Sequence, residues 1–527
     1  MHVSREKQCA ALWAAGFGVW LVVAICGDPF VLKVWNTTLA LGLLAAAVAV
    51  PGGAALAWLL WRSTAHGRTP ALALTAAWLV MPLYLQAAAW KALFDDWTTP
   101  GGQASWQDGW VFLRACWVHA LHAIPWSTAA FSVALLYLPR NWEEQASLQV
   151  RPRRAWLAAT WPVWLGAAAV TGMWELFVVT TDITVTDLFQ VRTFAEMIYL
   201  QFAIGESPDF RPFGWESWLF LVWLVVLLAT TLRQAQPPIG EPVERSWRAA
   251  ADAAPSVWPT ILLWSLLLVW LGVPAAVLAR QAGTEYVSAG GPWTARWSYW
   301  KLLGVVAGIG PQRDQFVARQ FESQWYWSAW ITGLGAAITT LLASLLAWTA
   351  RWRRHGGPIV FCALAISAAV PGPQWGIWLV GFFTGWNLPW LNYLYDRTVA
   401  APVLAGVIRA LPLATLIWWL AFRGLPRHLC EAATLAGWGW LRQWCLLAVP
   451  ARVRVIPWVA LLAGAIVFAD LGATLPVIPP GVLTITVRVF DLLHAGVDDL
   501  AAAICLLLAI VVTAVTTSAV VLERWQR

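Results

Sequence analysis

The residues of this sequence that could carry chemistry are ionisable side chains inside apolar segments. His122 and Arg409 each stand three residues before a proline, Pro125 and Pro412, within a long apolar run. Ionisable side chains at membrane depth are costly and mark, by default, a route for a polar solute or an ion. The alternative is that both side chains donate hydrogen bonds to backbone carbonyls that the prolines leave unpaired. His122 and Arg409 are therefore possible pathway-lining residues.

Two acidic residues form a second candidate pair. Glu175 and Asp470 each lie 13 residues after a proline. We expect both near the outer ends of their helices, where they either line the same route or are solvated. His119 lies on the helix face of His122, but two histidines without a carboxylate make a weak metal site. Polar packing is the favoured interpretation, and no metal or other cofactor is predicted.

The spacing of these residues is part of an internal repeat. His122 and Arg409 are 287 residues apart, and the same offset relates the two prolines that follow them. It also relates the segment 138–146, LPRNWEEQA, to the segment 425–433, LPRHLCEAA. Each segment is a short polar stretch between two apolar ones. The chain is therefore predicted to be a tandem duplication whose unit carries one polar loop.

Composition places the chain in a membrane. Apolar residues make up 60% of it and charged residues 12%, whereas soluble domains carry about 25% charged residues. A spanning helix needs roughly 20 mostly apolar residues, and about twelve such stretches can be recognised. They centre near Val19, Ala49, Met81, Pro125, Ala169 and Val225 in the first half, and near Leu268, Ile338, Ala369, Leu411, Gly464 and Leu508 in the second.

The predicted fold is an all-α integral membrane protein of about twelve transmembrane helices in two tandem six-helix repeats. The first repeat covers residues 1–232, a linker 233–255 and the second repeat 256–527. An even number of spans per half gives both halves the same orientation, which makes this a parallel repeat.

Lysine and arginine set the expected orientation. With the N-terminus inside and the spans alternating, most basic residues fall on the inner side, as the positive-inside rule requires. Both termini and both duplicated polar loops are then cytoplasmic. The net charge of +7 reflects this bias, so the lipid bilayer is a partner and nucleic acid is not.

The polar loop of the second half resembles that of a known family. It carries a spaced set of residues: Glu431-Ala432-Ala433, Gly437, Leu447, Val449 and Pro450. This set is similar to the loop E-A-A-x3-G-x9-I-x-L-P of binding-protein-dependent ABC importer permeases. A short helix, a glycine turn and a proline that opens the next transmembrane helix are the expected local structure.

The first loop matches less well, with Glu144-Gln145-Ala146 for the acidic motif and Val150 at the glycine position. The resemblance covers residues 37–232 and 328–521. The segments Asp470–Thr474 and Pro479–Gly481 also look like the fused two-domain permeases of the ferric-iron branch.

Partners and location follow from this resemblance as expectations. It implies the type I importer fold in a bacterial-type plasma membrane, an extracytoplasmic binding protein that delivers a small hydrophilic solute such as ferric iron, and a cytoplasmic ATPase dimer. The residues expected at the ATPase-docking loops are Glu144, Ala146, Glu431, Ala432, Ala433, Gly437 and Pro450.

The chain itself is not expected to be an enzyme. A phosphate-binding P-loop places lysine directly after a glycine, and none of the four lysines, Lys7, Lys33, Lys91 and Lys301, follows one. No HExxH or GxSxG motif is present either, so a membrane enzyme is poorly supported. The main alternative is a secondary transporter driven by an ion gradient, which also uses two six-helix halves.

Overall fold

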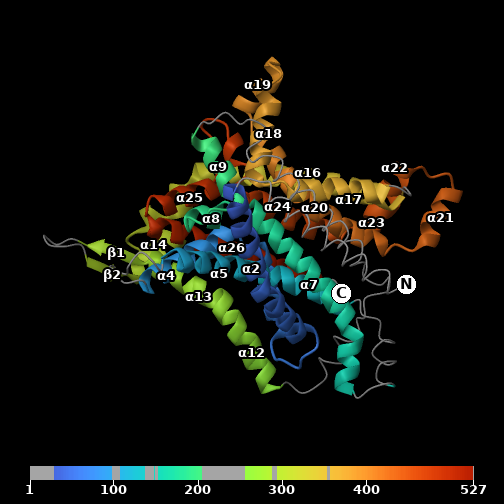
Figure 1. Ribbon diagram of the computed structural model, residues 1–527, viewed down its shortest axis with the longest axis horizontal. Coiled ribbons are helices and arrows are strands. Elements are labelled where there is room, and N and C mark those ends of the chain that lie inside the picture. The colour runs from blue at the N-terminus through green and yellow to red at the C-terminus, as the bar shows by residue number, and fades with distance from the viewer. Residues whose placement is uncertain are drawn as a thin grey trace.

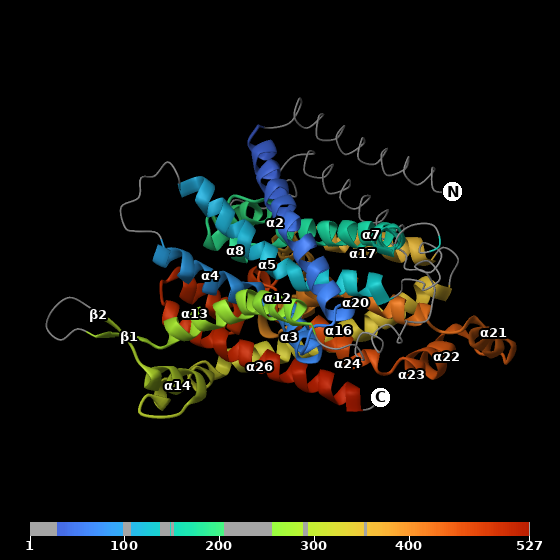
Figure 2. The same cartoon turned by 90° about the horizontal axis from the view of Figure 1, so that it is seen from below.

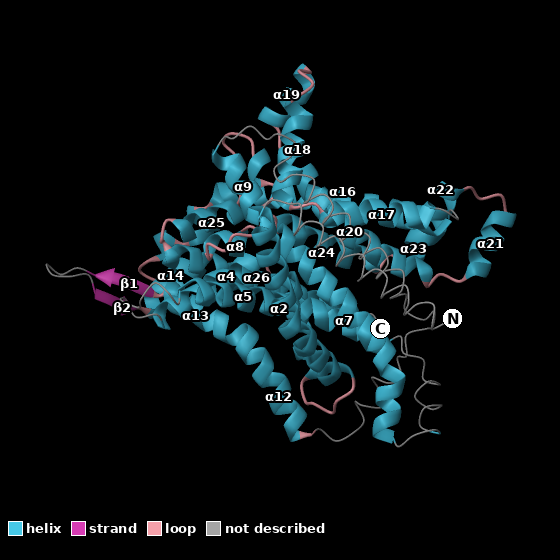
Figure 3. Ribbon diagram, in the orientation of Figure 1, coloured by secondary structure: helices cyan, strands magenta, loops and turns pink. Residues whose placement is uncertain are grey.

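The computed structural model describes residues 29–97, 107–136, 148, 152–204, 256–287, 294–352 and 356–525. These residues are almost entirely helical, with one two-stranded hairpin (Figure 3). Four predicted features lie outside them: the first polar loop with Glu144 and Ala146, the linker 233–255, and the apolar stretches around Val19 and Val225.

The described helices of the first half run from α2 to α9 and are coloured blue to green in Figure 1. They are α2 (Pro29–Trp61), α3 (Arg68–Val80), α4 (Leu83–Trp97), α5 (Gln107–Leu136), α7 (Pro152–Thr181), α8 (Thr184–Leu188) and α9 (Phe194–Ile204).

The second half begins with a long helix that contains a π-helical turn, followed by a hairpin and short helices. These are α12 (Val257–Leu267), η2 (Leu268–Gly272), α13 (Val273–Ala282), β1 (Thr284–Val287), β2 (Thr294–Trp297), α14 (Tyr299–Ala307), η3 (Arg313–Gln315) and α15 (Val317–Gln320). The strands pair antiparallel, with Thr284 opposite Trp297.

The remaining helices form the body of the second half. They are α16 (Glu322–Trp352), α17 (Gly356–Ala369), α18 (Gly372–Thr384), α19 (Pro389–Arg397), α20 (Ala400–Arg423), α21 (Arg427–Leu435), α22 (Trp440–Gln443), η4 (Trp444–Ala448), α23 (Val449–Ala451), α24 (Val455–Ala469), η5 (Leu475–Val477), α25 (Ile485–His494) and α26 (Asp498–Trp525).

The helices are those of a multi-pass membrane protein. Six of the described helices are long and apolar enough to cross a membrane, and the number rises to nine if each sharply bent pair is one span. This is fewer than the twelve predicted from sequence. Part of the difference is that two predicted spans lie outside the described residues.

Two predicted spans are broken in the middle by a proline. Helices α3 and α4 meet at an angle of 96° and α17 and α18 at 102°. The breaks fall at Met81-Pro82 and Val370-Pro371, where the stretches around Met81 and Ala369 were expected to run straight. Proline lacks an N–H and disfavours the helical conformation of the residue before it, which explains both breaks.

Each half is built around one packed set of three helices. Helix α2 packs along α5 and α7, and α16 packs along α20 and α24. The halves also contact one another, since α3 meets α24 and α17 meets α7. A hydroxyl on the first helix of each set anchors a short helix: Thr38 Oγ1 accepts the N–H of Phe194 (3.0 Å), and Ser328 Oγ accepts that of Ile485 (2.8 Å).

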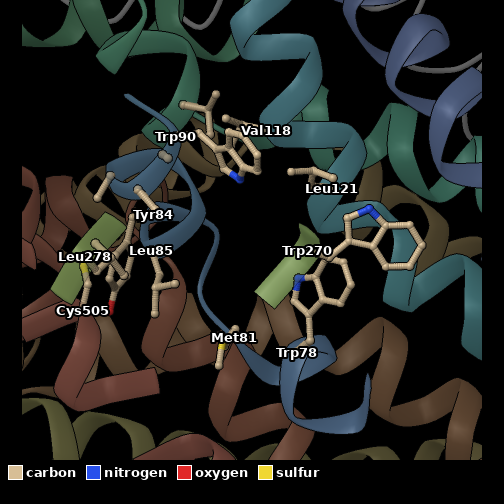
Figure 4. Close-up of a cluster of buried hydrophobic side chains, with 14 of the residues drawn as sticks. Trp78, Met81, Tyr84, Leu85, Trp90, Val118, Leu121, Trp270, Leu278 and Cys505 are labelled. Atoms are coloured by element: carbon tan, nitrogen blue, oxygen red, sulfur yellow. The ribbon is translucent and has the colours of Figure 1, made fainter. Parts of the chain in front are cut away.

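Several tryptophans are fully buried in the helix cores. At the α3–α4 bend, Trp78 packs on Trp270 of η2, with ring centroids 5.4 Å apart (Figure 4). Trp348 and Trp418 are fully buried in a second core with Phe422. Part of the abundance of tryptophan, 43 residues in the whole chain, therefore lies in helix packing.

Two loop structures lie at opposite ends of the molecule. The β1–β2 hairpin and α14 project at one end and α21 at the other, as both views show (Figures 1 and 2). The bundle between them carries the bent helices and the long straight ones.

An ion pair links the short helices of the two halves. His494 Nε2 of α25 lies 3.0 Å from Asp187 Oδ2 of α8. Burial raises the pKa of the Asp187 carboxyl above its ordinary value, and the nearby His494 partly offsets this. The pair therefore ties α8 of the first half to α25 of the second.

Candidate functional site: a polar cavity between the halves

A carboxylate holds the turn at the end of α7. Asp182 Oδ1 accepts the backbone N–H of Thr184, and Asp182 Oδ2 accepts that of Val185, both at 3.0 Å. The hydroxyl of Thr186 donates to the Asp182 carbonyl at 3.1 Å. Asp182 thus satisfies N–H groups of the first turn of α8, which have no partner within that helix.

The same arrangement occurs at the end of α24. Asp470 Oδ2 accepts the N–H groups of Ala473 (3.2 Å) and Thr474 (3.1 Å), and the Thr474 hydroxyl donates to the Asp470 carbonyl (2.6 Å). By this role, the residue of the first half that resembles Asp470 is Asp182. The sequence analysis paired Asp470 with Glu175 instead, because both follow a proline at the same distance.

Arg409 joins these two turns across the boundary between the halves. From α20, its Nε lies 3.5 Å from Asp470 Oδ1. Its terminal NH2 donates to Thr181 Oγ1, the last residue of α7, at 2.9 Å. One guanidinium therefore contacts the ends of both α24 and α7.

The backbone carbonyl that Pro412 leaves unpaired, that of Ile408, is bound by Ser367 and not by Arg409. Pro412 cannot donate to Ile408, four residues earlier, and the Ile408 carbonyl accepts the hydroxyl of Ser367 from α17 at 3.0 Å. A hydroxyl from a neighbouring helix is a common solution in membrane proteins. The alternative role considered for Arg409, satisfying this carbonyl, is therefore wrong.

Glu175 lies in a buried cluster behind these turns. Its Oε1 is 3.8 Å from His119 Nδ1, and His119 Nε2 is 3.5 Å from Asp182 Oδ2. The side chains of His119 and Glu175 are fully buried, and neither carboxylate oxygen of Glu175 has a hydrogen-bond partner. We expected a residue near a helix end, either pathway-lining or solvated, but packing of α5 against α7 encloses it.

A cavity of about 170 Å³ opens between the two turns. Three of the four predicted pathway residues line it: His122, Arg409 and Asp470. Glu175 is not among its lining residues. Among the described residues, no group of three or more histidine, cysteine, aspartate or glutamate side chains could hold a metal ion.

Sequence reasoning missed three residues of this cavity. Asp182, Trp126 and Trp174 line it together with the predicted residues. Asp182 could have been found from a short sequence pattern. An aspartate followed four residues later by a threonine occurs at Asp182 and Thr186 and again at Asp470 and Thr474. The two tryptophans had no signal, because tryptophan is common throughout the chain.

The predicted loop of the second half contains a helix that ends in a glycine turn. Helix α21 carries Glu431, Ala432 and Ala433, and Gly437 adopts a left-handed φ of 77°. The N–H of Trp438 donates to the Ala433 carbonyl (2.9 Å) and that of Gly437 to the carbonyl of Thr434 (3.0 Å). These two bonds define a Schellman motif, in which glycine is favoured.

Side chains from within the loop and from α16 hold α21 in place. Buried Gln443 donates to the Trp438 carbonyl at 2.9 Å, and Arg351 donates to the Leu425 carbonyl at 2.9 Å. The outer face stays open, with Glu431 and Ala432 exposed and Leu435 at 90% exposure. The helix is thus a fixed, exposed projection.

The loop pattern predicted that Pro450 begins the next transmembrane helix, and this prediction is wrong. It lies within α23, which ends at Ala451, and α24 begins at Val455 after a bend of 92°. The residues Arg452–Arg454 form a turn between the two helices. Helix α24 therefore begins after these three intervening residues.

Neither a protein-family model nor a curated protein sequence matches this chain.

Removing the Ser367 hydroxyl should destabilise the protein. Ser367→Ala leaves the partly buried Ile408 carbonyl without a donor, which costs roughly 1–3 kcal/mol. Ser344→Ala is the matched control, because that hydroxyl donates only to Leu341 within its own helix. Thermal unfolding of the purified variants measures both. Equal melting temperatures for the two variants would contradict this assignment of the carbonyl's partner.

Proposed function

We propose that this chain is the membrane-spanning permease of an ATP-driven importer of the binding-protein-dependent type. In this proposal it passes a small hydrophilic solute, with ferric iron as one candidate, from an extracytoplasmic binding protein to the cytoplasm. A separate cytoplasmic ATPase dimer supplies the energy, and the membrane is a bacterial-type plasma membrane.

The observation that carries the proposal is helix α21. A short helix bearing Glu431-Ala432-Ala433 stands at one end of the bundle, stops at a left-handed glycine and exposes Leu429 and Leu435. Exposed apolar side chains beside an acidic residue suit a groove on a partner protein. Arg351 of α16 donates to the Leu425 carbonyl just before α21 and lies 3.8 Å from Cys430 Sγ within it. Since α16 packs along α20 and α24, which line the cavity, force applied to α21 would reach these helices.

The duplication is the second part of the proposal. We infer that α2–α9 and α16–α25 are two copies of one unit, related by a pseudo-twofold axis along the membrane normal. The supporting observations are the equivalent helix contacts, the two proline bends and the two aspartate-capped turns. The first loop, around Glu144 and Ala146, would then be a second docking point for the ATPase dimer.

A secondary transporter is the second candidate function. It is favoured by the enclosed cluster of His119, Glu175 and Asp182, because buried ionisable groups of this kind serve as proton relays in carriers. Such a transporter would need no ATPase. The two functions therefore differ in their energy source, which can be measured.

The purified chain should hydrolyse no ATP on its own. Purification from native membranes should recover two ATPase subunits per chain, because each half would supply one docking loop. Stoichiometry by mass spectrometry and ATPase assays of the complex check this. Uptake driven by a proton or sodium gradient without ATP would contradict the importer and support the second candidate.

A substitution at Gly437 should weaken recovery of the ATPase. Gly437→Ala forces a side chain into a left-handed conformation, which costs about 1 kcal/mol or more, and this should loosen the end of α21. Gly439→Ala is the matched control. Gly439 has a φ of −68°, which alanine adopts without strain, and at neither position would the added Cβ contact another atom. Co-purified ATPase should fall for Gly437→Ala alone, and an equal fall for both variants would show that the left-handed turn is unimportant.

A further inference from the structure

The cavity between the two aspartate turns is lined by hydrogen-bond donors that have no acceptor. The indole N–H groups of Trp126 and Trp174 are buried without partners, and Arg409 Nε makes no hydrogen bond, although it faces Asp470 Oδ1 at 3.5 Å. His122 Nδ1 also has no partner, and it is a donor in one of the two neutral tautomers. Trp126 and Trp174 lie side by side, with ring centroids 5.0 Å apart.

The acceptors beside the cavity are already occupied. Both carboxylate oxygens of Asp182 accept backbone N–H groups, and Asp470 Oδ2 accepts two more. The remaining oxygen, Asp470 Oδ1, faces Arg409 at 3.5 Å. Thr181 Oγ1 accepts from Arg409 and donates to Phe177. What is left unsatisfied around the cavity is a set of N–H groups.

Buried donors without acceptors are costly, so native proteins pair nearly all of them. Here they come from both halves: Trp126 and His122 from α5, Trp174 from α7, and Arg409 from α20. An anionic oxygen group accepts several N–H donors at once and forms stronger bonds than a neutral acceptor. A bare metal cation would be repelled by the guanidinium and would have to compete for the Asp182 and Asp470 oxygens with the backbone N–H groups and with Arg409.

We propose that this cavity binds its solute through an anionic oxygen group such as a carboxylate, phosphate or sulfate. The inference rests on the proposed function, since it names the class of solute that the permease passes. A metal ion would then cross only within a complex whose outer surface carries such groups. The volume of about 170 Å³ accommodates the anionic group and part of the solute.

The test uses the purified full chain in lipid nanodiscs, with citrate, inorganic phosphate and sulfate as probes and spermidine as the cationic comparison. At constant ionic strength, at least one of the three anions should raise the melting temperature saturably, and spermidine should not. Trp174→Phe keeps the ring but removes the N–H, so it should weaken the apparent affinity by about tenfold, the loss of one hydrogen bond to a charged group. Trp126→Phe should act alike and serves if the first variant does not fold.

Trp78→Phe is the matched control. Trp78 is also buried with an unpaired indole N–H, but it lies in the core near Trp270 and not at the cavity, so its substitution should leave anion affinity unchanged. Three results would overturn the proposal: no saturable stabilisation by any anion, equal stabilisation by spermidine, or equal loss in Trp78→Phe and Trp174→Phe. The measurement involves no ATPase, so its failure is independent of whether the chain is an ATP-driven importer.

Discussion

Two buried turns depend on two carboxylates. Where α7 and α24 end, the chain must leave the helical state among apolar helices, and backbone N–H groups there have no water to bind. Asp182 and Asp470 satisfy these groups. The cost of burying a negative charge at Asp470 is partly offset by the guanidinium of Arg409, which lies 3.5 Å away.

This requirement also shapes the cavity. Because the aspartates are engaged by backbone and by Arg409, they add little free acceptor capacity, and the unpaired groups that remain are donors. The two halves are not equal in this respect. The first half places His119 and Glu175 behind its turn, whereas Gly406 of the second half, which lies 287 residues after His119, packs against the apolar Val467. One half therefore holds a buried polar cluster and the other an apolar contact.

Local patterns in the sequence predicted local structure well, and tertiary contacts accounted for the misses. The helical membrane class follows from composition, and the glycine turn at Gly437 depends only on neighbours along the chain. The bends at Met81 and Ala369 were missed because hydropathy averages across a proline. Glu175 was misplaced because its exposure depends on how α5 packs over α7, and Asp182 was missed because counting from prolines aligned the wrong residue with Asp470. The role of Arg409 required knowing that Ser367, 42 residues away, binds the Ile408 carbonyl.

Arg409 of the second half is held by Thr181 of the first, and this hydrogen bond joins the two halves beside the cavity. A double-mutant cycle with Arg409→Leu and Thr181→Val, read as unfolding free energy, tests it most directly. The structure predicts a coupling of about 1 kcal/mol or more, as for residues in contact. The same cycle with Thr180→Val, whose hydroxyl donates to the Phe177 carbonyl, should give a coupling near zero. Equal couplings for Thr180 and Thr181 would contradict the hydrogen bond between Arg409 and Thr181.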